Sequence, residues 1–506
     1  MKKHLCILLL SSFSAFAQLP GIAWQNTYGG TGSDGLFCTT QTADGGYITS
    51  GTAYSADGDI TQNFGESDGW VAKLDETGAI EWQKSYGGSL NEQIYKILQT
   101  PDGGYIFAGY SDSVDGEFSA AHGTGDIWVA KIDAAGTVQW QQLLGGGYYD
   151  WANDITIAAD GGFVVAGHSQ FQDGEFIQQN VFIVKLDTQG AIVWQKSYGG
   201  SLSEVAYGIE NTTDGGYIIA GATQSNDGDV TGFHYTEEEG LITLDAWILK
   251  LDGDGNLQWQ KALGGYQDDM AFTIKQTADG GYITAAQTTS YNGDVTQAYG
   301  SYDYWIVKLD ASGAITWQKS LGGNGYDEAH GVTETADGYI VGGMTYSLTD
   351  DVTANYGGGD VWLVKLGLSG AMVWEKNFGG TLTDYAYDIY TNTEGNFIVT
   401  GYTHSADMDV TDNYGNGDGW ILNIAPDALG LVQNVFTESL LSPNPASDTI
   451  SLSGIAVNSV NYTITDISGR AVATGTVQES IDVKNLSAGI YLLTTPGGQR
   501  KKFIKK

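Results

Sequence analysis

The chain repeats one pattern of short apolar runs separated by polar, glycine-containing turns. Over residues 94–146 it reads IYKILQT, PDGG, YIFAGYS, a polar loop, DIWVAKID, AAG and TVQWQQLLGG. Four such runs, joined through glycine turns, predict four β-strands in two hairpins. The runs are apolar on both faces, as in a sheet that packs between two neighbouring sheets.

A tryptophan followed by Gln or Glu, and shortly by Gly-Gly, marks each repeat. It recurs at steps of 58, 58, 54, 65, 58 and 57 residues, at Trp24, Trp82, Trp140, Trp194, Trp259, Trp317 and Trp374. Four strands in each of seven units predict an all-β fold, a seven-bladed β-propeller over residues 18–426. The fourth-strand tryptophans are expected in the core.

The ends of the repeat array predict how the ring closes. In six units an aromatic residue lies 12 positions before the fourth-strand tryptophan. Trp420 has only Val432 at that distance, whereas Trp24 has no third strand before it. We therefore expect the segment around Trp24 to complete the seventh blade and residues 427–440 to form a linker. A recurring second-strand glycine, such as Gly51, is expected to keep neighbouring blades clear of one another near the axis.

The N-terminus has the pattern of an export signal. A basic start, a short apolar run and a small-x-small cleavage motif predict a signal peptide over residues 1–17, with Lys2, Lys3, Leu5–Leu10 and Ala15–Ala17 as its parts. Its removal leaves Cys38 as the one cysteine, which excludes an intrachain disulfide. The apolar run is too short to cross a bilayer, and no longer run follows, so no transmembrane segment is expected.

The C-terminus changes character after about residue 437, where short β-like runs predict a small Ig-like β-sandwich over residues 441–506. Four motifs follow in order: Pro443–Ala446 (PNPA), Asp466-x-x-Gly469-Arg470, Leu486-x-x-Gly489-x-Tyr491 and a lysine-rich end. Together they resemble the type A sorting domain of type IX secretion. The resemblance implies that the type IX machinery is a partner and that the cargo is secreted or held at the outer-membrane surface.

Charge narrows the range of partners. The chain has 60 acidic and 22 basic residues, a formal net charge of −38, and its two arginines, Arg470 and Arg500, both lie near the C-terminus. Such a surface repels phosphate backbones and anionic lipid, which argues against a nucleic-acid partner.

One face of the predicted propeller concentrates carboxylates. The loop between the second and third strands carries a recurring Ser-x-Asp-Gly-Asp motif, and the third strand opens on Asp or Asn. Oxygen ligands beside a glycine turn suit Ca²⁺, the only cofactor that the sequence suggests. The candidate ligands are Asp57, Asp59, Asp68, Asp227, Asp229, Asp245, Asp407, Asp409 and Asp418. Two alternatives stay open: the side chains cap turn amides, or a carboxylate pair hydrolyses glycans.

Two features break the repeat, as a ligand site must. Trp151 lies outside both tryptophan series, and aromatic rings beside a carboxylate are typical of a sugar platform or a protein hot spot. The candidate residues there are Tyr148, Tyr149, Asp150 and Trp151. The alternative is that Trp151 begins an inner strand and is buried. An insertion in blade four adds Phe233, His234 and Tyr235 over the same face, as a lid, a partner contact or neutral decoration.

The hairpin KLDETGAIEWQ resembles the tryptophan-docking repeat of quinoprotein propellers, with an Asp75–Gly78 gap one residue shorter. That likeness supports blade topology only, because the ring has neither an arginine nor the adjacent cysteines associated with a quinone. We interpret the chain as an exported binding or adhesion module for a glycan or a protein, more in keeping with binding than with catalysis. The alternatives are a secreted carbohydrate-active enzyme that uses rim carboxylates, or a structural surface-layer component.

Overall fold

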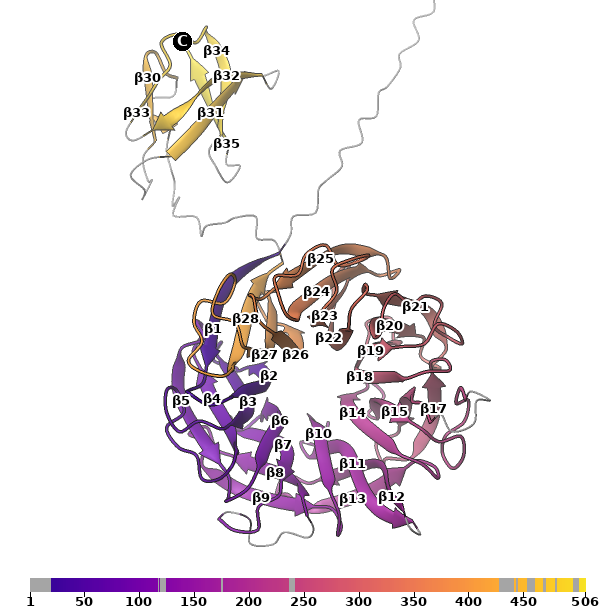
Figure 1. Cartoon of the computed structure of the whole chain (residues 1–506). Coiled ribbons are helices and arrows are strands. Elements are labelled where there is room, and N and C mark those ends of the chain that lie inside the picture. The colour runs from indigo at the N-terminus through magenta and orange to yellow at the C-terminus, as the bar shows by residue number, and fades with distance from the viewer. Residues whose placement is uncertain are drawn as a thin grey trace, which may run out of the picture. The chain divides into compact units, whose positions relative to one another are not determined.

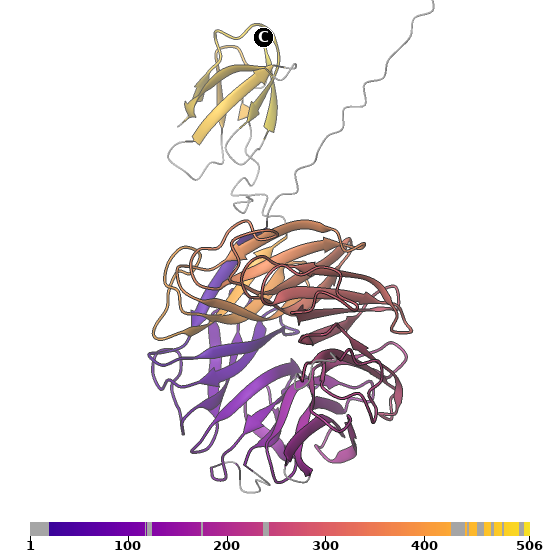
Figure 2. The same ribbon diagram turned by 45° about the vertical axis from the view of Figure 1, so that its right-hand side comes forward.

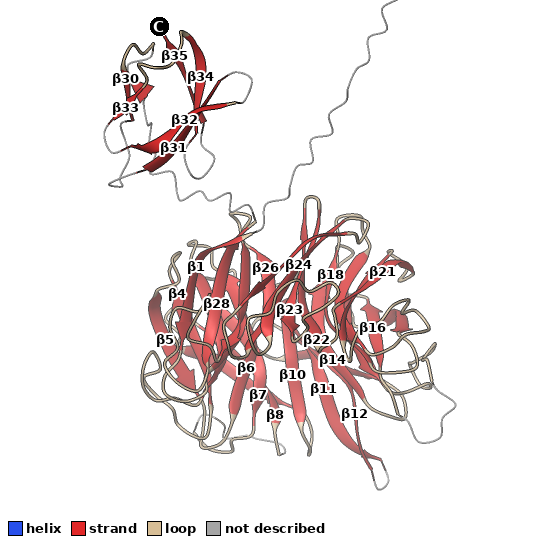
Figure 3. Ribbon diagram, turned by 45° about the horizontal axis from the view of Figure 1, so that its top comes forward, coloured by secondary structure: helices blue, strands red, loops and turns tan. Residues whose placement is uncertain are grey.

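The computed structural model describes residues 20–116, 118, 124–173, 176–235, 242–426, 441–442, 445–452, 460–466, 470–477, 480–494 and 500–506. The predicted signal peptide and the linker over residues 427–440 lie outside the described residues. The chain divides into two compact units, residues 1–426 and 427–506. All regular structure in the described residues is β-strand, as Figure 3 shows.

The first unit is a ring of seven four-stranded antiparallel sheets, viewed along its axis in Figure 1. Six blades follow chain order from the inner to the outer strand. Blade one is β2 Gly35–Gln41, β3 Tyr47–Ala53, β4 Asp68–Leu74 and β5 Ile80–Tyr86; blade two is β6 Glu92–Gln99, β7 Tyr105–Ser111, β8 Asp126–Ile132 and β9 Val138–Leu144; blade three is β10 Asp150–Ile157, β11 Phe163–Asp173, β12 Phe176–Leu186 and β13 Ile192–Tyr198.

The remaining blades continue around the ring and confirm the predicted propeller. Blade four is β14 Glu204–Asn211, β15 Tyr217–Thr223, β16 Asp245–Leu251 and β17 Leu257–Leu263; blade five is β18 Asp269–Gln276, β19 Tyr282–Thr288, β20 Asp303–Leu309 and β21 Ile315–Leu321; blade six is β22 Asp327–Thr335, β23 Gly338–Thr345, β24 Asp360–Gly367 and β25 Met372–Phe378; blade seven is β26 Asp384–Thr391, β27 Phe397–Thr403, β28 Asp418–Ala425 and β1 Gly21–Tyr28.

The N-terminal strand closes the ring, as its unpaired tryptophan predicted. β1 pairs with β28 in antiparallel register, with Trp24 opposite Asn423. Trp420 Nε1 donates a hydrogen bond of 2.8 Å to Gln25 Oε1 across this pair. The two ends of the propeller are therefore held together within one blade, which leaves β28 without an open edge.

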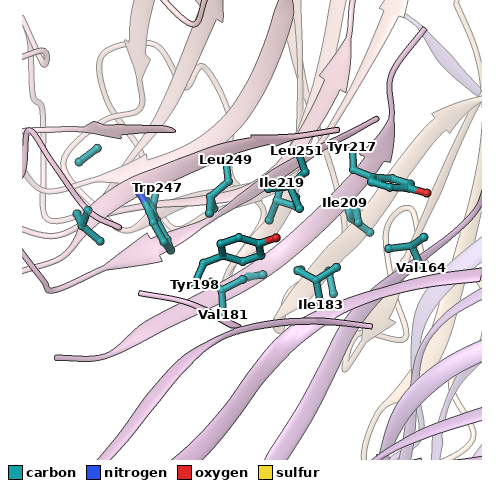
Figure 4. Packing of buried hydrophobic residues seen from close by; sticks show 14 of the residues in the cluster. Val164, Val181, Ile183, Tyr198, Ile209, Tyr217, Ile219, Trp247, Leu249 and Leu251 are labelled. Carbon is teal, nitrogen blue, oxygen red and sulfur yellow. The ribbon is translucent and has the colours of Figure 1, made fainter. Parts of the chain in front are cut away.

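The core lies between neighbouring blades. The second and third strands of most blades are buried along their whole length, and each apolar cluster joins two adjacent sheets. Figure 4 shows the cluster between blades three and four, where Val181, Tyr198 and Trp247 meet. Figure 2 shows the same stacking of blades around the ring from another side. Burial of both sheet faces explains why the strands are apolar on both sides.

One expectation about this core held in part, because the fourth-strand tryptophans pack against its edge, and one was wrong. The fully buried tryptophans belong to the third strand, such as Trp305, whereas fourth-strand tryptophans such as Trp317 are half-buried. Six of these seven outer rings pack beneath the glycine turn of the next blade; a Cβ on Gly370, for example, would lie 2.8 Å from the Trp317 ring. The second-strand glycine clears its own blade rather than a neighbour, because a Cβ on Gly51 would lie 1.8 Å from the Gly35 carbonyl oxygen.

The C-terminal unit contains two small sheets around its own apolar cluster. One sheet has the order β29 Leu441–Ser442, β30 Thr449–Leu452 and β33 Ser480–Asp482; the other has the order β32 Ala471–Val477, β31 Val460–Asp466, β34 Gly489–Thr494 and β35 Arg500–Lys505. Ile450, Ile464, Leu493 and Phe503 are buried between them.

Candidate functional site

The inner strand of each of the seven blades carries a β-bulge at the same position. The ladder register shifts between Leu36 and Cys38, for example, so Phe37 has no direct partner on β3. A bulge re-aims the extra side chain, and the inner strands surround the ring axis in Figure 1. We call the seven bulge residues the axial collar: Phe37, Tyr95, Asn153, Tyr207, Phe272, His330 and Tyr387.

The axial collar encloses a cavity of about 460 Å³, to which Gln93 also contributes. Its rings form a chain around the axis, because Phe37 lies 5.0 Å from Tyr95 and 5.3 Å from Tyr387 between ring centroids. Phe272 lies 5.1 Å from Tyr207 and 4.8 Å from His330. Each collar side chain is half-buried, so aromatic faces and hydroxyl groups line an open hollow.

Trp151 lies at the edge of this collar. It is half-buried in β10, stacks on Tyr110 at 4.1 Å between ring centroids, and its Nε1 donates to the Tyr95 hydroxyl at 3.2 Å. Tyr149 is exposed beside it, and the Tyr148 hydroxyl donates to Gln172. Of the predicted aromatic site, Trp151 contacts the collar directly, and Tyr149 lies next to Trp151.

Asp150 has a different place from its aromatic neighbours. It is fully buried, and one of its oxygens accepts the Gly146 amide at 2.6 Å. Glu204 and Asp384 accept the equivalent amides in their own blades. Asp150 therefore belongs to a repeated loop-holding position and does not face the hollow around Trp151.

Below the collar, the next inward-facing positions form the channel waist: Lys96, Asp154, Glu210, Lys275 and Asp388, which line a second cavity of about 260 Å³. Lys96 Nζ lies 3.1 Å from Asp388, and Lys275 Nζ lies 2.6 Å from Glu210. The Asp154 carboxylate instead accepts backbone amides from Ile155 and Ile209. Aromatic and charged layers thus follow one another along the axis.

The blade-four insertion lines a separate hollow of about 340 Å³, together with Ser201 and Leu202 of the loop between β13 and β14. Phe233 packs against the core between blades three and four, and Tyr235 is exposed. His234 Nδ1 lies 3.0 Å from Asp245, which raises the pKa of the imidazole. Residues 236–241 of the insertion lie outside the described residues.

The rim aspartates hold loops together. Asp57 accepts the backbone amide of Thr31 at 2.8 Å and its hydroxyl at 2.9 Å. Asp227 and Asp407 accept the equivalent amides of Ser201 and Thr381. The second acid of each motif, Asp59, Asp229 or Asp409, lies 3.2–3.4 Å from the first glycine amide of the preceding loop. These contacts are the turn caps of the first alternative.

The third-strand acids lie elsewhere, at the junctions between blades. A Cβ on Gly379 would lie 2.5 Å from Asp360 of blade six and 2.6 Å from Asp384 of blade seven. Gly87 separates Asp68 from Glu92 in the same way, and Gly29 separates Asp418 from Asp34. We call these junction pairs. Only glycine leaves room for two carboxylates there, which explains the first residue of the recurring Gly-Gly.

Burial and like charge raise the pKa of these junction carboxylates. Burial, and then neighbouring carboxylates, raise the pKa of Asp360 to about 7 and that of Asp303 to about 6. Asp269 is also raised to about 7 and Asp418 to about 6. One oxygen of Asp303, Asp360 and Asp418 is buried without a hydrogen-bond partner in the described part of the chain. Folding therefore favours the protonated form of these carboxyl groups relative to the unfolded chain.

A thermal measurement distinguishes calcium binding at the rim aspartates from turn capping. Among the described residues, no three His, Cys, Asp or Glu side chains group closely enough to hold a metal ion. We expect the Tm of the EDTA-treated chain to stay unchanged on adding calcium, because a cation at Asp57 would displace amide and hydroxyl donors within 2.9 Å. A calcium-dependent rise would instead identify the rim aspartates as metal ligands.

The sequence analysis missed the collar although its signal is present. The seven collar positions recur at the same steps as the fourth-strand tryptophans, and six of the seven carry a ring. The ligand site was sought among residues that break the repeat, whereas the collar consists of residues that recur in every repeat.

Comparisons with known proteins identify the C-terminal unit. Residues 441–506 match the family described as "Secretion system C-terminal sorting domain". The chain is therefore a type IX secreted protein with a β-propeller, destined for the cell surface or the extracellular space. No helix in the described residues is long and apolar enough to cross a membrane.

Weaker similarities extend over more of the chain. The regulatory protein FlaEY of Caulobacter vibrioides is 25% identical over 267 residues, which span 48% of this chain and 28% of that protein. The Pan2 WD40 domain of Neurospora crassa is 10% identical, over 65% of this chain and 88% of that one, with a TM-score of 0.37. Sqt1 of Chaetomium thermophilum is 10% identical, over 80% and 99% of the two chains, with a TM-score of 0.41.

Proposed function

We propose that the propeller is an extracellular carbohydrate-binding module and that the axial collar is its binding site. The observation that carries this proposal is the cavity of about 460 Å³ with rings contributed by six inner strands. Pyranose rings present apolar faces that stack on aromatic side chains and hydroxyls that need polar partners. Gln93, Asn153 and the collar tyrosines place such partners beside the rings.

Export agrees with this proposal. A secreted module meets polysaccharides of surfaces and matrices, and the sorting domain brings the chain there. Trp151 and Tyr149 extend the aromatic surface from the collar toward blades two and three, so a chain longer than one sugar has further rings to contact. A protein ligand is the alternative outcome of the binding experiment.

Substitution of one collar ring tests the proposal. We expect Phe37→Ala to weaken binding to a polysaccharide about tenfold or more, since Phe37 contacts two other collar rings and hot-spot aromatics contribute about 2 kcal/mol. The measurement is depletion of the chain from solution by insoluble cellulose, chitin and xylan. Phe64→Ala is the matched control, because Phe64 is 49% exposed on the outer loop of blade one.

Two results would contradict the proposal. If none of the polysaccharides depletes the native chain, the collar has no carbohydrate role of this kind. If Phe37→Ala and Phe64→Ala lose binding equally, the sugar binds outside the collar. Release of soluble sugars by the native chain would instead favour the enzyme alternative.

A further inference from the structure

We propose that the collar recognises a positively charged amine, so that the carbohydrate is an amino sugar. This inference rests on the proposed function and adds the chemical class of its ligand. It follows from three features of the channel: the aromatic faces, a carboxylate at the collar's edge, and the charge balance of the channel waist.

The aromatic faces provide the first part of the site. Ring faces carry negative electrostatic potential, and an ammonium group within about 6 Å of a ring centroid is attracted to it. Tyr95, Phe37 and Tyr387 follow one another on one side of the hollow, and Tyr207 and Phe272 lie on the other. A cation on the axis is therefore flanked by several rings at once.

Glu328 supplies a carboxylate at the edge of the collar. It precedes the collar residue His330 by two positions in β22 and lies beside its imidazole. Its side chain is 13% exposed; one oxygen lies 3.4 Å from His330 Nε2 and the other accepts the Tyr326 hydroxyl at 2.8 Å. Burial, and then the charge of Glu328, raise the pKa of Tyr207, in keeping with the place of this carboxylate beside the collar residue His330.

His330 and Tyr326 keep Glu328 ionised. Although burial alone would raise its pKa, the neighbouring imidazole and hydroxyl bring the pKa below its ordinary value. The carboxylate is held in place by both contacts. An amine that enters the collar would therefore meet an ionised carboxylate that is shared with His330.

The channel waist adds negative charge beneath the rings. Lys96 and Lys275 are each paired with a carboxylate, Asp388 and Glu210. Asp154 accepts the backbone amides of Ile155 and Ile209, so the waist contains three acids and two lysines. Residues 18–426 contain no arginine that could reverse this balance. An anionic sugar is repelled by such a channel, whereas an ammonium group is attracted.

Two oligosaccharides that differ only at nitrogen test the inference. The probes are β-1,4-linked hexamers of glucosamine and of N-acetylglucosamine, titrated calorimetrically into the full chain at pH 6, where the glucosamine amines are largely protonated. We expect the glucosamine hexamer to bind about tenfold more tightly, as a partly buried cation–aromatic and carboxylate contact allows, and we expect this preference to shrink at high salt.

Glu328→Gln should remove most of that preference, because the glucosamine hexamer loses more affinity than the N-acetylated hexamer does. The matched control is Glu76→Gln, which removes the same charge from an exposed turn at the opposite face. Comparable thermal unfolding of both variants would show that the change at Glu328 acts on binding rather than on folding.

The outcomes separate the inference from the proposed function. Equal affinity for the two hexamers would contradict recognition of an amine but would be consistent with a sugar site at the collar. Binding of neither hexamer, together with no polysaccharide binding, overturns both. A third titration uses Nα-acetyl-lysine amide; if this probe binds more tightly than the glucosamine hexamer, the amine belongs to a protein side chain and the amino sugar is wrong.

Discussion

Acidification from pH 8 to pH 5 is expected to raise the Tm of the propeller by several degrees. The cause is the set of junction pairs, in which a buried carboxylate of one blade faces a carboxylate of the next. The pKa is raised to about 7 at Asp269 and Asp360 and to about 6 at Asp303 and Asp418, chiefly by burial.

Proton linkage explains why the Tm is expected to rise, and not fall, on acidification. An unfolded chain releases these protons near the ordinary carboxyl pKa of about 4, whereas the folded ring keeps them up to about pH 6 to 7. The folded state thus binds more protons in that interval, so its stability falls as the pH rises through it. Self-repulsion at a net charge of −38 acts in the same direction.

Acids with lowered pKa values limit the window. The turn carboxylates Asp102, Asp214 and Asp279, each close to a lysine, have pKa values of about 2. They stay ionised at pH 5, and their stabilising effect is lost only in stronger acid. The scan from pH 8 to pH 5 therefore leaves these ion pairs undisturbed, and His234, whose pKa is raised by its hydrogen bond to Asp245, adds to the gain in stability at low pH.

Blade three provides a natural comparison for the junction pairs. Asn180 occupies the third-strand position that carries Asp in the other blades. When its side-chain amide is turned so that the oxygen and the nitrogen both face suitable partners, the nitrogen donates to Glu204 at 3.2 Å. We expect Asp360→Asn to stabilise the chain at pH 8 by about 1–3 kcal/mol, the effect of removing a buried unpaired charge, and to flatten the pH profile.

Asn180→Asp is the reverse variant and should destabilise the chain at pH 8 but not at pH 5. Both variants are measured by circular dichroism melts across the pH range. A Tm that is independent of pH between 5 and 8, or an Asp360→Asn variant less stable than the native chain at pH 8, would show that the junction pairs are ionised and compensated.

The second large effect concerns the two tryptophan positions of one hairpin. Trp305→Ala is expected to destabilise the chain by about 3–5 kcal/mol, because the ring is fully buried and its loss leaves a cavity between blades four and five. Trp317→Ala should cost less, roughly 1–2 kcal/mol, because its half-buried ring loses less apolar contact.

Urea unfolding of the two variants and the native chain measures this difference directly. The pair is well matched, since both rings lie in blade five and each donates one Nε1 hydrogen bond, Trp305 to Gln318 and Trp317 to the Leu368 carbonyl. Equal losses would mean that the outer rings lock neighbouring blades as firmly as the inner core does.

Part of the candidate site was visible in the sequence. The residues that break the repeat led to Trp151 and Tyr149, and the structure places this pair beside the collar. The chemistry of the rim aspartates was also narrowed to turn capping, calcium binding or glycan hydrolysis by a carboxylate pair. The collar itself was missed, because no window of one repeat shows that Phe37 and Tyr387 meet across 350 residues of chain.

The sequence alone determined the number of blades, their strand order, the closing strand around Trp24 and the export of the chain. These properties are local or periodic: a turn glycine, an apolar run or a terminal motif has the same meaning wherever it recurs. Tertiary structure alone decided which repeated side chains face the axis, which carboxylates meet at the junctions and which tryptophans are buried. A bulge reverses the side on which a residue lies, and contacts between blades join residues of different repeats, so both depend on the closed ring.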